Sequence, residues 1–216
     1  MADAGPLTWQ PTLLDTASAP DVDHSFSSLV RVDLDATSWV DQAPSWVSGS
    51  DELLSRLIAD TDWGQRWRWM YERRVPEPRL TAGWSLSSGE PLEPPVLEHM
   101  RQVLSARYGV DLDSMGLNLY RDGKDSVAWH GDRIAREVAE PIVALVSLGE
   151  PRRFLARTAG GGPSRAFALG RGDLLVTGGG FQRRWQHSVP KVASAGARLS
   201  IAFRHGADHR TYPAAG

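Results

Sequence analysis

The second half of the chain consists of short apolar segments separated by glycine-rich turns, and this pattern limits the possible fold more than any other feature. Each segment has the length of a β-strand, and stretches such as "TAGGGPS" are typical of loops. Short strands at close, regular spacing indicate an antiparallel sandwich or barrel. The expected strands are "MGLNLY", "PIVALVSLG", "RRFLART", "SRAFALG", "GDLLVTG" and "RLSIAFR".

The first half predicts two helices and an early strand. "SDELLSRLIAD" has helical apolar spacing, with Ser50 as the expected N-cap, and "PPVLEHMRQVLSARYG" should end at Gly109. "SLVRVDLD" alternates with strand period. Residues 1–27 are rich in Asp, Ser, Ala and Pro and are expected to be a weakly structured lead-in. Because no linker divides the rest, we expect one domain over residues 28–210.

Composition narrows the class of protein. A chain of 216 residues with 41% hydrophobic content can bury one sizeable core. The absence of cysteine excludes disulfides and thiolate metal sites, and it fits a cytoplasmic location. No apolar run reaches the roughly 20 residues needed to span a bilayer, and the start lacks the pattern of a signal peptide. We expect a cytoplasmic monomer without membrane contact.

Charge is unevenly distributed along the chain. Residues 1–100 contain 7 Lys/Arg and 16 Asp/Glu, whereas residues 101–216 contain 17 and 10. A basic second half suits an acidic partner such as nucleic acid. The alternative is that the two halves neutralise each other within one folded domain.

A candidate metal site begins at "AWHGDR". His130 and Asp132 are two residues apart, so on an extended segment both side chains leave the same face. His187, in "RWQHSVPK", could join them from a neighbouring strand. Two histidines and a carboxylate are the ligand set of non-haem Fe(II) oxygenases. The H-x-D spacing alone is not specific, because a surface His–Asp pair also satisfies it.

The segment "RLSIAFR" adds a second chemical feature. Its apolar residues point to one face, and the other face carries Arg198, Ser200, Ala202 and Arg204. Two guanidinium groups near a metal suit a dicarboxylate, because an arginine fork binds a carboxylate through two hydrogen bonds. 2-Oxoglutarate is such a dicarboxylate.

These motifs together resemble the AlkB family of Fe(II)/2-oxoglutarate-dependent dioxygenases. The similarity covers roughly residues 118–205 and extends more loosely back to Trp63. It rests on N-x-Y, G-x-D, H-x-D, a distal histidine and R-x-S-x-x-x-R, in that order. The matching segments are "NLYRDGKDSVAWHGD", "VSLGEPRRFLAR", "GDLLVTGGGFQRRWQHSVPK" and "RLSIAFR".

The resemblance implies a mainly β fold with flanking helices, a double-stranded β-helix or jelly roll, with its catalytic core at about 114–205. It implies Fe(II), 2-oxoglutarate and O2 as the cofactor and cosubstrates. The implied iron ligands are His130, Asp132 and His187. The implied 2-oxoglutarate contacts are Arg198, Tyr120 and Ser200 at the distal carboxylate and Asn118 and Arg204 at the keto-acid end.

The resemblance also implies oxidative demethylation of N-alkylated bases in single- or double-stranded nucleic acid, DNA rather than RNA, as in DNA alkylation repair. This reaction releases succinate, CO2 and formaldehyde. Residues of about 63–86 resemble the family's nucleotide lid and mix aromatic side chains with arginines, which suits unstacked bases and phosphates. Candidate substrate contacts are Trp67, Trp69, Tyr71, Trp129 and Arg133. Trp63 and Trp84 are expected in the core.

One departure from the family pattern affects substrate choice. Repair members usually carry an acidic residue shortly after H-x-D that meets the amine of the base, but Ile134 and Ala135 stand there. Two alternatives therefore remain open at this stage. The first is an Fe(II)/2-oxoglutarate hydroxylase of modified RNA, a protein or a small molecule. The second is a non-catalytic nucleic-acid-binding module that contains metal, against which the Arg198 and Arg204 pair argues.

Overall fold

A computed structural model describes residues 7–9, 18–70, 72–132 and 137–206. The helices are α1 (Ser50–Asp60), α2 (Pro95–Tyr108) and α3 (Phe181–Arg184), with a 3-10 turn, η1, at Leu86–Ser88. The strands are β1 (Asp21–Val22), β2 (Val30–Asp33), β3 (Ser38–Ala43), β4 (Val47–Ser48), β5 (Trp67–Met70), β6 (Arg73–Pro76), β7 (Leu80–Ser85), β8 (Leu112–Tyr120), β9 (Val127–His130), β10 (Val143–Gly149), β11 (Arg152–Thr158), β12 (Arg165–Leu169), β13 (Asp173–Gly179), β14 (Trp185–Val189) and β15 (Arg198–His205).

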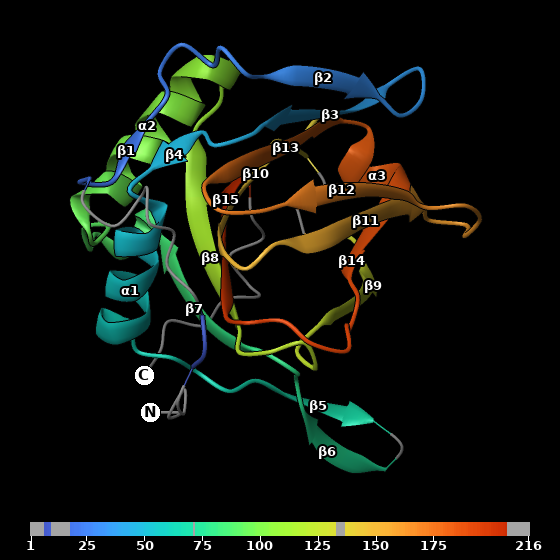
Figure 1. Cartoon of the computed structure of the whole chain (residues 1–216). Helices are drawn as coiled ribbons and strands as arrows, with labels where there is room; N and C mark the ends of the chain where they lie inside the picture. The colour runs from blue at the N-terminus through green and yellow to red at the C-terminus, as the bar shows by residue number, and fades with distance from the viewer. Residues whose placement is uncertain (1–6, 10–17, 71, 133–136, 207–216) are drawn as a thin grey trace.

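Two antiparallel sheets form the body, as the strand pattern predicts. The larger sheet has the order β2-β3-β13-β10-β15-β8-β7, and the smaller has the order β12-β11-β14-β9. Figure 1 shows the smaller sheet facing the middle of the larger one. The fold is mainly β with flanking helices, and it is a jelly roll. Strand β15 lies between β10 and β8 and is hydrogen-bonded to both.

The apolar residues divide into two cores, one on each face of the larger sheet. The first core lies between this sheet and helices α1 and α2, and it contains Leu104 of α2 and Leu199, Ile201 and Phe203 of β15. The second core lies between the two sheets and includes Phe154 and Phe181. Helices α1 and α2 therefore cover one face of the larger sheet and leave its other face for the smaller sheet (Figure 1).

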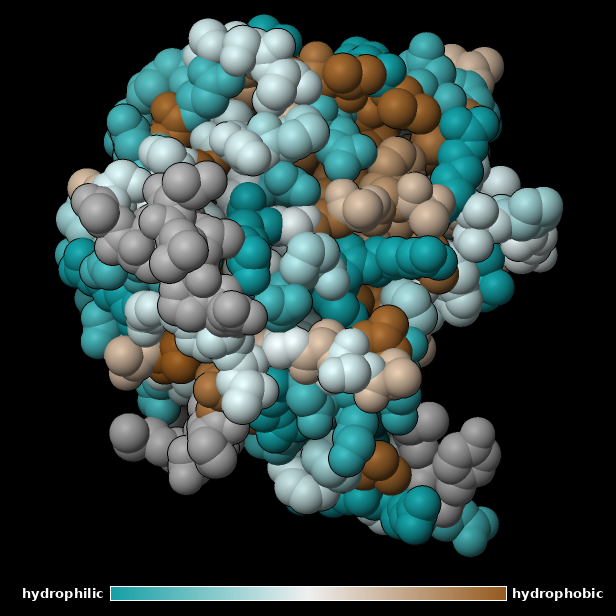
Figure 2. Space-filling view, viewed as in Figure 1, coloured by the Kyte–Doolittle hydropathy of each residue, from teal (hydrophilic) through white to brown (hydrophobic). Residues whose placement is uncertain are grey.

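A two-stranded hairpin, β5–β6, projects from the body toward the viewer's lower right (Figure 1). Its visible surface is largely hydrophilic in the space-filling view (Figure 2). Trp67 and Trp69 on β5 have exposed fractions of 52% and 72%. The two aromatic side chains are therefore accessible on the surface of this hairpin.

The two expected helices and the expected early strand, β2, are present, but the first half also contributes strands that were not expected, of which β3 and β7 belong to the larger sheet. Helix α1 is capped by Gly49, whose φ is 61°, and Ser50 is the first helical residue rather than the N-cap. Gly109 ends α2 in the left-handed conformation, as predicted. Residues 18–27, within the expected lead-in, include β1, which pairs with β4. Within the described residues, no helix is long and apolar enough to span a bilayer.

The packing of α2 on the larger sheet can be tested by truncating Leu104, which is fully buried. Leu104→Ala should lower the free energy of unfolding by about 2–5 kcal/mol, because it removes buried methyl groups and leaves a cavity. Urea denaturation measures this difference. The matched control is Leu86→Ala, at a leucine that is 45% exposed, with an expected change within about 0.5 kcal/mol. Equal effects of the two substitutions would contradict the packing described.

Candidate active site

A cavity of about 640 Å³ opens between the two sheets. Strands β8 and β15 form its wall on the larger sheet, and β9, β11 and β14 contribute from the smaller sheet. Residues of the β5–β6 region and of β7 also line the cavity. It brings together all of the predicted iron and 2-oxoglutarate contacts: Asn118, Tyr120, His130, Asp132, His187, Arg198, Ser200 and Arg204.

The two histidines come together because β9 and β14 are antiparallel neighbours. His130 is in register with His187, and their ring centroids are 4.2 Å apart. Strand β9 ends at His130, so Asp132 lies just beyond the strand and not on it. His187 Nε2 and Asp132 Oδ2 are 3.8 Å apart. One ligand atom from each of the three residues lies within 4.8 Å of the others, so the group could hold a metal ion.

The protonation states of this group also suit a metal. Burial would raise the pKa of the Asp132 carboxyl, but Arg204, His187 and His130 outweigh it and lower the pKa to about 2. Burial lowers the pKa of His187 to about 4, so its imidazole is neutral at neutral pH. The His130 Nδ1 donates to the Ala128 carbonyl at 2.9 Å, which leaves Nε2 as the nitrogen that faces the other two residues. Asp132 and His187 are therefore already in the forms that bind a metal.

Neighbouring side chains fix the positions of the three residues. The Phe154 ring stacks on the His187 ring at 5.0 Å, with an interplanar angle of 17°. Gln182 Oε1 accepts the backbone N–H of Asp132 at 3.3 Å, and Gln182 Nε2 donates to Thr177 Oγ1 at 2.9 Å. These contacts hold Asp132 in place beyond the end of β9.

Arg198 is a buried cation on the cavity wall, with only 2% of its surface exposed. Its Nε donates to Ser147 Oγ at 2.9 Å, and its Cζ lies 5.1 Å from the centre of the Tyr120 ring. Among the described residues, its Nη1 has no hydrogen-bond partner. Burial lowers the pKa of Arg198 below its usual value. A buried guanidinium with an unpartnered donor is costly unless an anion joins it.

Arg204 connects β15 to the histidine–aspartate group. Its Nε donates to Asp132 Oδ1 at 3.2 Å, and its Nη1 donates to the Ala202 carbonyl at 3.1 Å. A Cβ added to Gly116 on the neighbouring strand would lie 2.8 Å from Arg204 Nη1. Glycine at this position therefore provides the space that the Arg204 guanidinium occupies.

The predicted substrate contacts do not all reach the cavity. Trp69 lines the cavity. Trp67 is not among the lining residues, and Arg74 lies 5.7 Å from the centre of its ring. Trp129 is also not among them, because it alternates with His130 along β9 and packs under the Arg157 guanidinium at 4.0 Å. Tyr71, Arg133, Ile134 and Ala135 lie outside the described residues. Trp63 is buried and Trp84 is partly buried in the first core, as predicted.

Sequence reasoning missed a charged group at the mouth of the cavity. Glu77 is 7% exposed, accepts a hydrogen bond from Arg68 and pairs with Arg79 at 2.8 Å. Arg79 Nε in turn donates to Asn118 Oδ1 at 2.9 Å. Burial would raise the pKa of Glu77, but Arg68 and Arg79 outweigh it and lower the pKa. The "EPRL" segment in the lid-like stretch was the only signal in the sequence for this group.

The sequence was compared with models of protein families and with curated proteins. The family model for the 2OG-Fe(II) oxygenase superfamily matches residues 50–204. A curated relative, alpha-ketoglutarate-dependent dioxygenase alkB homolog 3 of Rattus norvegicus, is 30% identical over 214 residues, covering 90% of this chain and 70% of the relative. The chain is an AlkB-family 2OG-Fe(II) oxygenase.

Further relatives fit this assignment. DNA oxidative demethylase ALKBH2 of Arabidopsis thaliana is 33% identical over 135 residues, which cover 51% of this AlkB-family chain and 43% of the relative. The solved structure of OsALKBH1 has a TM-score of 0.57 and 14% identity over 82% of this chain and 100% of its own length. The structural match supports the jelly-roll fold alone.

As a member of this family, the chain is a dioxygenase that uses Fe(II), 2-oxoglutarate and O2. The residues of the cavity fit these groups. The donor set of two imidazoles, of which the His187 ring is neutral, and one carboxylate suits Fe(II). The unpartnered Arg198 Nη1 suits a carboxylate of 2-oxoglutarate.

The role of Gly116 gives a test of this geometry. Gly116→Ala should lower 2-oxoglutarate turnover by about tenfold or more, because the added methyl displaces the Arg204 guanidinium from Asp132 and a charge-assisted hydrogen bond is lost. Succinate formation measures turnover. The control is Gly160→Ala, because a Cβ there meets nothing within 4 Å, and its turnover should stay unchanged. Normal turnover in Gly116→Ala would refute the crowding at Arg204.

Proposed function

We propose that this oxygenase oxidatively demethylates N-alkylated bases in nucleic acid, DNA rather than RNA, in DNA alkylation repair. The observation that carries the proposal is the exposed Trp69 beside Arg66 and Arg68 at the mouth of a cavity that contains a two-histidine, one-carboxylate group. An aromatic ring offers a surface on which a base stacks, and the arginines suit phosphates. The curated relatives named as DNA oxidative demethylases support the same reaction class.

In this proposal His130, Asp132 and His187 hold Fe(II). The chemistry that Fe(II), O2 and 2-oxoglutarate supply together is the oxidation of a C–H bond, with succinate and CO2 as coproducts. A methyl group on a base nitrogen, once hydroxylated, leaves as formaldehyde. The chain's own residues keep Asp132 anionic and His187 neutral, and the two sheets bury His187 beside the cavity.

Arg198 binds the distal carboxylate of 2-oxoglutarate in this proposal, with Tyr120 and Ser200 beside it. Asn118 and Arg204 contact the keto-acid end, next to Asp132. The order along β15 supports this arrangement, because Arg204 lies against Asp132 and Arg198 lies toward the opposite end of the strand. A molecule with carboxylates at both ends can therefore bridge the two arginines.

The substrate side of the cavity consists of the β5–β6 hairpin and the group formed by Arg68, Glu77 and Arg79. Trp69 stacks a base in this proposal, with Trp67 beside it as a second contact on the hairpin. We also propose that residues 28–210 act as one dioxygenase domain with its lid at about 63–86, its catalytic core at about 114–205 and residues 1–27 as a lead-in.

The decisive experiment is mass spectrometry of a pool of methylated DNA and RNA oligonucleotides incubated with protein, Fe(II), 2-oxoglutarate and ascorbate. Each demethylated oligonucleotide should lose about 14 mass units, the mass of a CH2 group, and DNA should react faster than RNA. His130→Ala is the control and should show no loss, because an iron ligand is removed. Succinate formation without any loss of mass from the oligonucleotides would show that the substrate belongs to another class of molecule.

The proposed role of Arg198 predicts a change in cosubstrate affinity. Arg198→Ala should raise the KM for 2-oxoglutarate by at least about tenfold, because a carboxylate loses its charge-assisted hydrogen bonds. Steady-state kinetics at varied 2-oxoglutarate measure this value. The control is Arg183→Ala, at an arginine on α3 whose Nη2 donates to the Val138 carbonyl and which does not line the cavity. An unchanged KM in Arg198→Ala would show that 2-oxoglutarate does not bind this arginine.

The hairpin offers a matched pair of tryptophans for testing substrate binding. Trp69→Ala should weaken binding of single-stranded DNA by about 1–3 kcal/mol, the contribution of one stacked base. Trp67→Ala should have the smaller effect, because Trp67 does not line the cavity. Fluorescence anisotropy with a labelled oligonucleotide measures both. Equal affinity of the wild type and both variants for the oligonucleotide would show that the hairpin does not contact DNA.

A further inference from the structure

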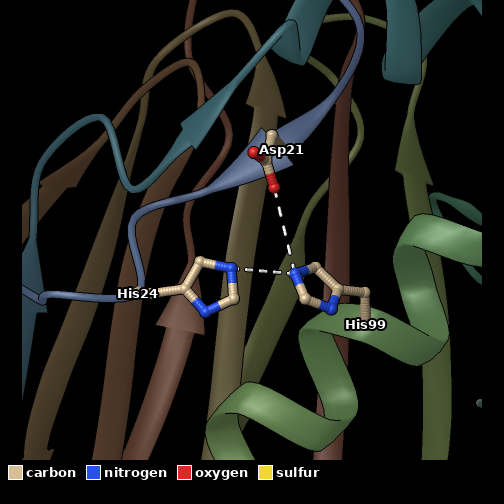
Figure 3. Close-up of side chains that lie close together, drawn as sticks. All are labelled: Asp21, His24 and His99. Atoms are coloured by element: carbon tan, nitrogen blue, oxygen red, sulfur yellow. Dashed lines mark hydrogen bonds and ion pairs between the residues drawn. The ribbon is translucent and has the colours of Figure 1, made fainter.

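A second group of potential metal ligands lies outside the cavity, where the segment after β1 meets helix α2. Figure 3 shows Asp21, His24 and His99 pointing toward one another. The Nε2 atoms of His24 and His99 are 3.0 Å apart, and Asp21 Oδ1 lies 3.9 Å from His99 Nε2. One ligand atom from each residue lies within 4.8 Å of the others. The two histidines are 75 residues apart in the chain, so the fold alone brings them together.

We propose that Asp21, His24 and His99 form a second metal site, which binds a divalent transition-metal ion such as Zn²⁺ and joins the N-terminal segment to α2. Two imidazole nitrogens and one carboxylate oxygen are typical zinc ligands, with bonds of about 2.0–2.1 Å. Tetrahedral geometry then separates ligand atoms by about 3.3 Å. The distances of 3.0 and 3.9 Å lie on either side of this value.

The two histidine Nε2 atoms are hydrogen-bonded to each other, and a metal ion between them would replace this hydrogen bond. An Nε2 atom of a neutral imidazole either donates a proton or offers a lone pair. Without a metal, His99 Nε2 faces both a second imidazole nitrogen and a carboxylate oxygen. With a metal between them, both lone pairs and the carboxylate point at one positive charge. The rings are tilted by 51° with centroids 4.8 Å apart, so they are not stacked on each other.

The N-terminal ligands are held in position by the segment's own hydrogen bonds. Val22 N–H donates to Asp21 Oδ1 at 2.8 Å, which orients this carboxylate. Asp23 N–H donates to the Trp46 carbonyl at 2.8 Å, and the Asp23 carbonyl accepts Trp46 Nε1–H at 3.0 Å. The Asp23 carboxylate also accepts the backbone N–H groups of Ser25 and Ser27. The turn that carries His24 is therefore fixed on both sides.

The third ligand, His99, is also held in a fixed position. His99 lies within α2, which packs on the larger sheet through buried side chains. Ligands on two rigid elements lose little conformational freedom on binding, so most of the bonding free energy appears as affinity. Asp21 and His24 are exposed and His99 is half-buried, so water can complete the coordination. A bound ion would link β1 to α2 across the surface.

This site is chemically separate from the cavity, but Zn²⁺ can bind both groups, since each has two histidines and a carboxylate. The test therefore uses the full chain carrying His130→Ala and His187→Ala, which removes two ligands of the cavity group. Isothermal titration of the metal-free protein with ZnCl2 should give one binding site. Zinc should also raise the midpoint of thermal unfolding, because it binds the folded state. Demethylation activity plays no part in this test.

Substitutions then assign the ligands. Adding His99→Ala to this background should weaken zinc binding by about 100-fold or more and abolish the thermal shift, because a direct ligand is lost. His24→Gln should also weaken zinc binding, and the glutamine side chain fills most of the space of the histidine ring. Circular dichroism of the metal-free variants checks that they are folded. Unchanged zinc binding in both variants would overturn the proposal, as would the absence of binding in the background protein.

A charge-matched pair separates ligation from general electrostatics. Asp21 and Asp60 have side chains exposed to 67% and 69%. Asp21→Asn should weaken zinc binding by about tenfold or more, whereas Asp60→Asn, which removes the same charge, should leave it within about twofold. Equal effects of the two substitutions would show that zinc responds to net charge only and would overturn the assignment of Asp21.

Discussion

Strand β15 (Arg198–His205) has two buried faces of opposite character, and the rest of the structure depends on this combination. Its apolar side chains pack against the layer that carries α1 and α2, and each contributes about 1.5–3 kcal/mol through burial. Its other face places Arg198 and Arg204 in the cavity, where desolvating a cation costs several kcal/mol. Asp132 offsets the cost at Arg204, and the carboxylate of a cosubstrate suits Arg198.

Much of this arrangement follows from local rules and could be predicted from the sequence. Side chains alternate across a strand, so the two arginines and the three apolar residues of β15 separate to opposite faces whatever the strand's neighbours are. Six strands of the second half were predictable because glycine-rich turns interrupt apolar runs of strand length, but β9 and β14, which carry the two histidines, lack such runs and were not among them. The spacing of His130 and Asp132 likewise indicated a shared direction, although Asp132 lies just beyond the end of β9.

Features that depend on distant parts of the chain were not predictable. The contact between Arg79 and Asn118 joins residues 39 positions apart and exists because β7 pairs with β8. The approach of His24 to His99 depends on how the segment after β1 crosses α2, which no spacing in the sequence encodes. Trp129 was expected in the cavity because it neighbours His130, but alternation along β9 turns it toward Arg157 instead.

The central position of β15 has a consequence for the order of events during protein synthesis. Its neighbours β10 and β8 both precede it in the chain, so during translation they exist with open hydrogen-bonding edges and no strand between them. Exposed strand edges invite pairing with other chains. These edges stay open to such pairing until residue 205 has left the ribosome, and the arginine-lined wall of the cavity is completed only at that late stage.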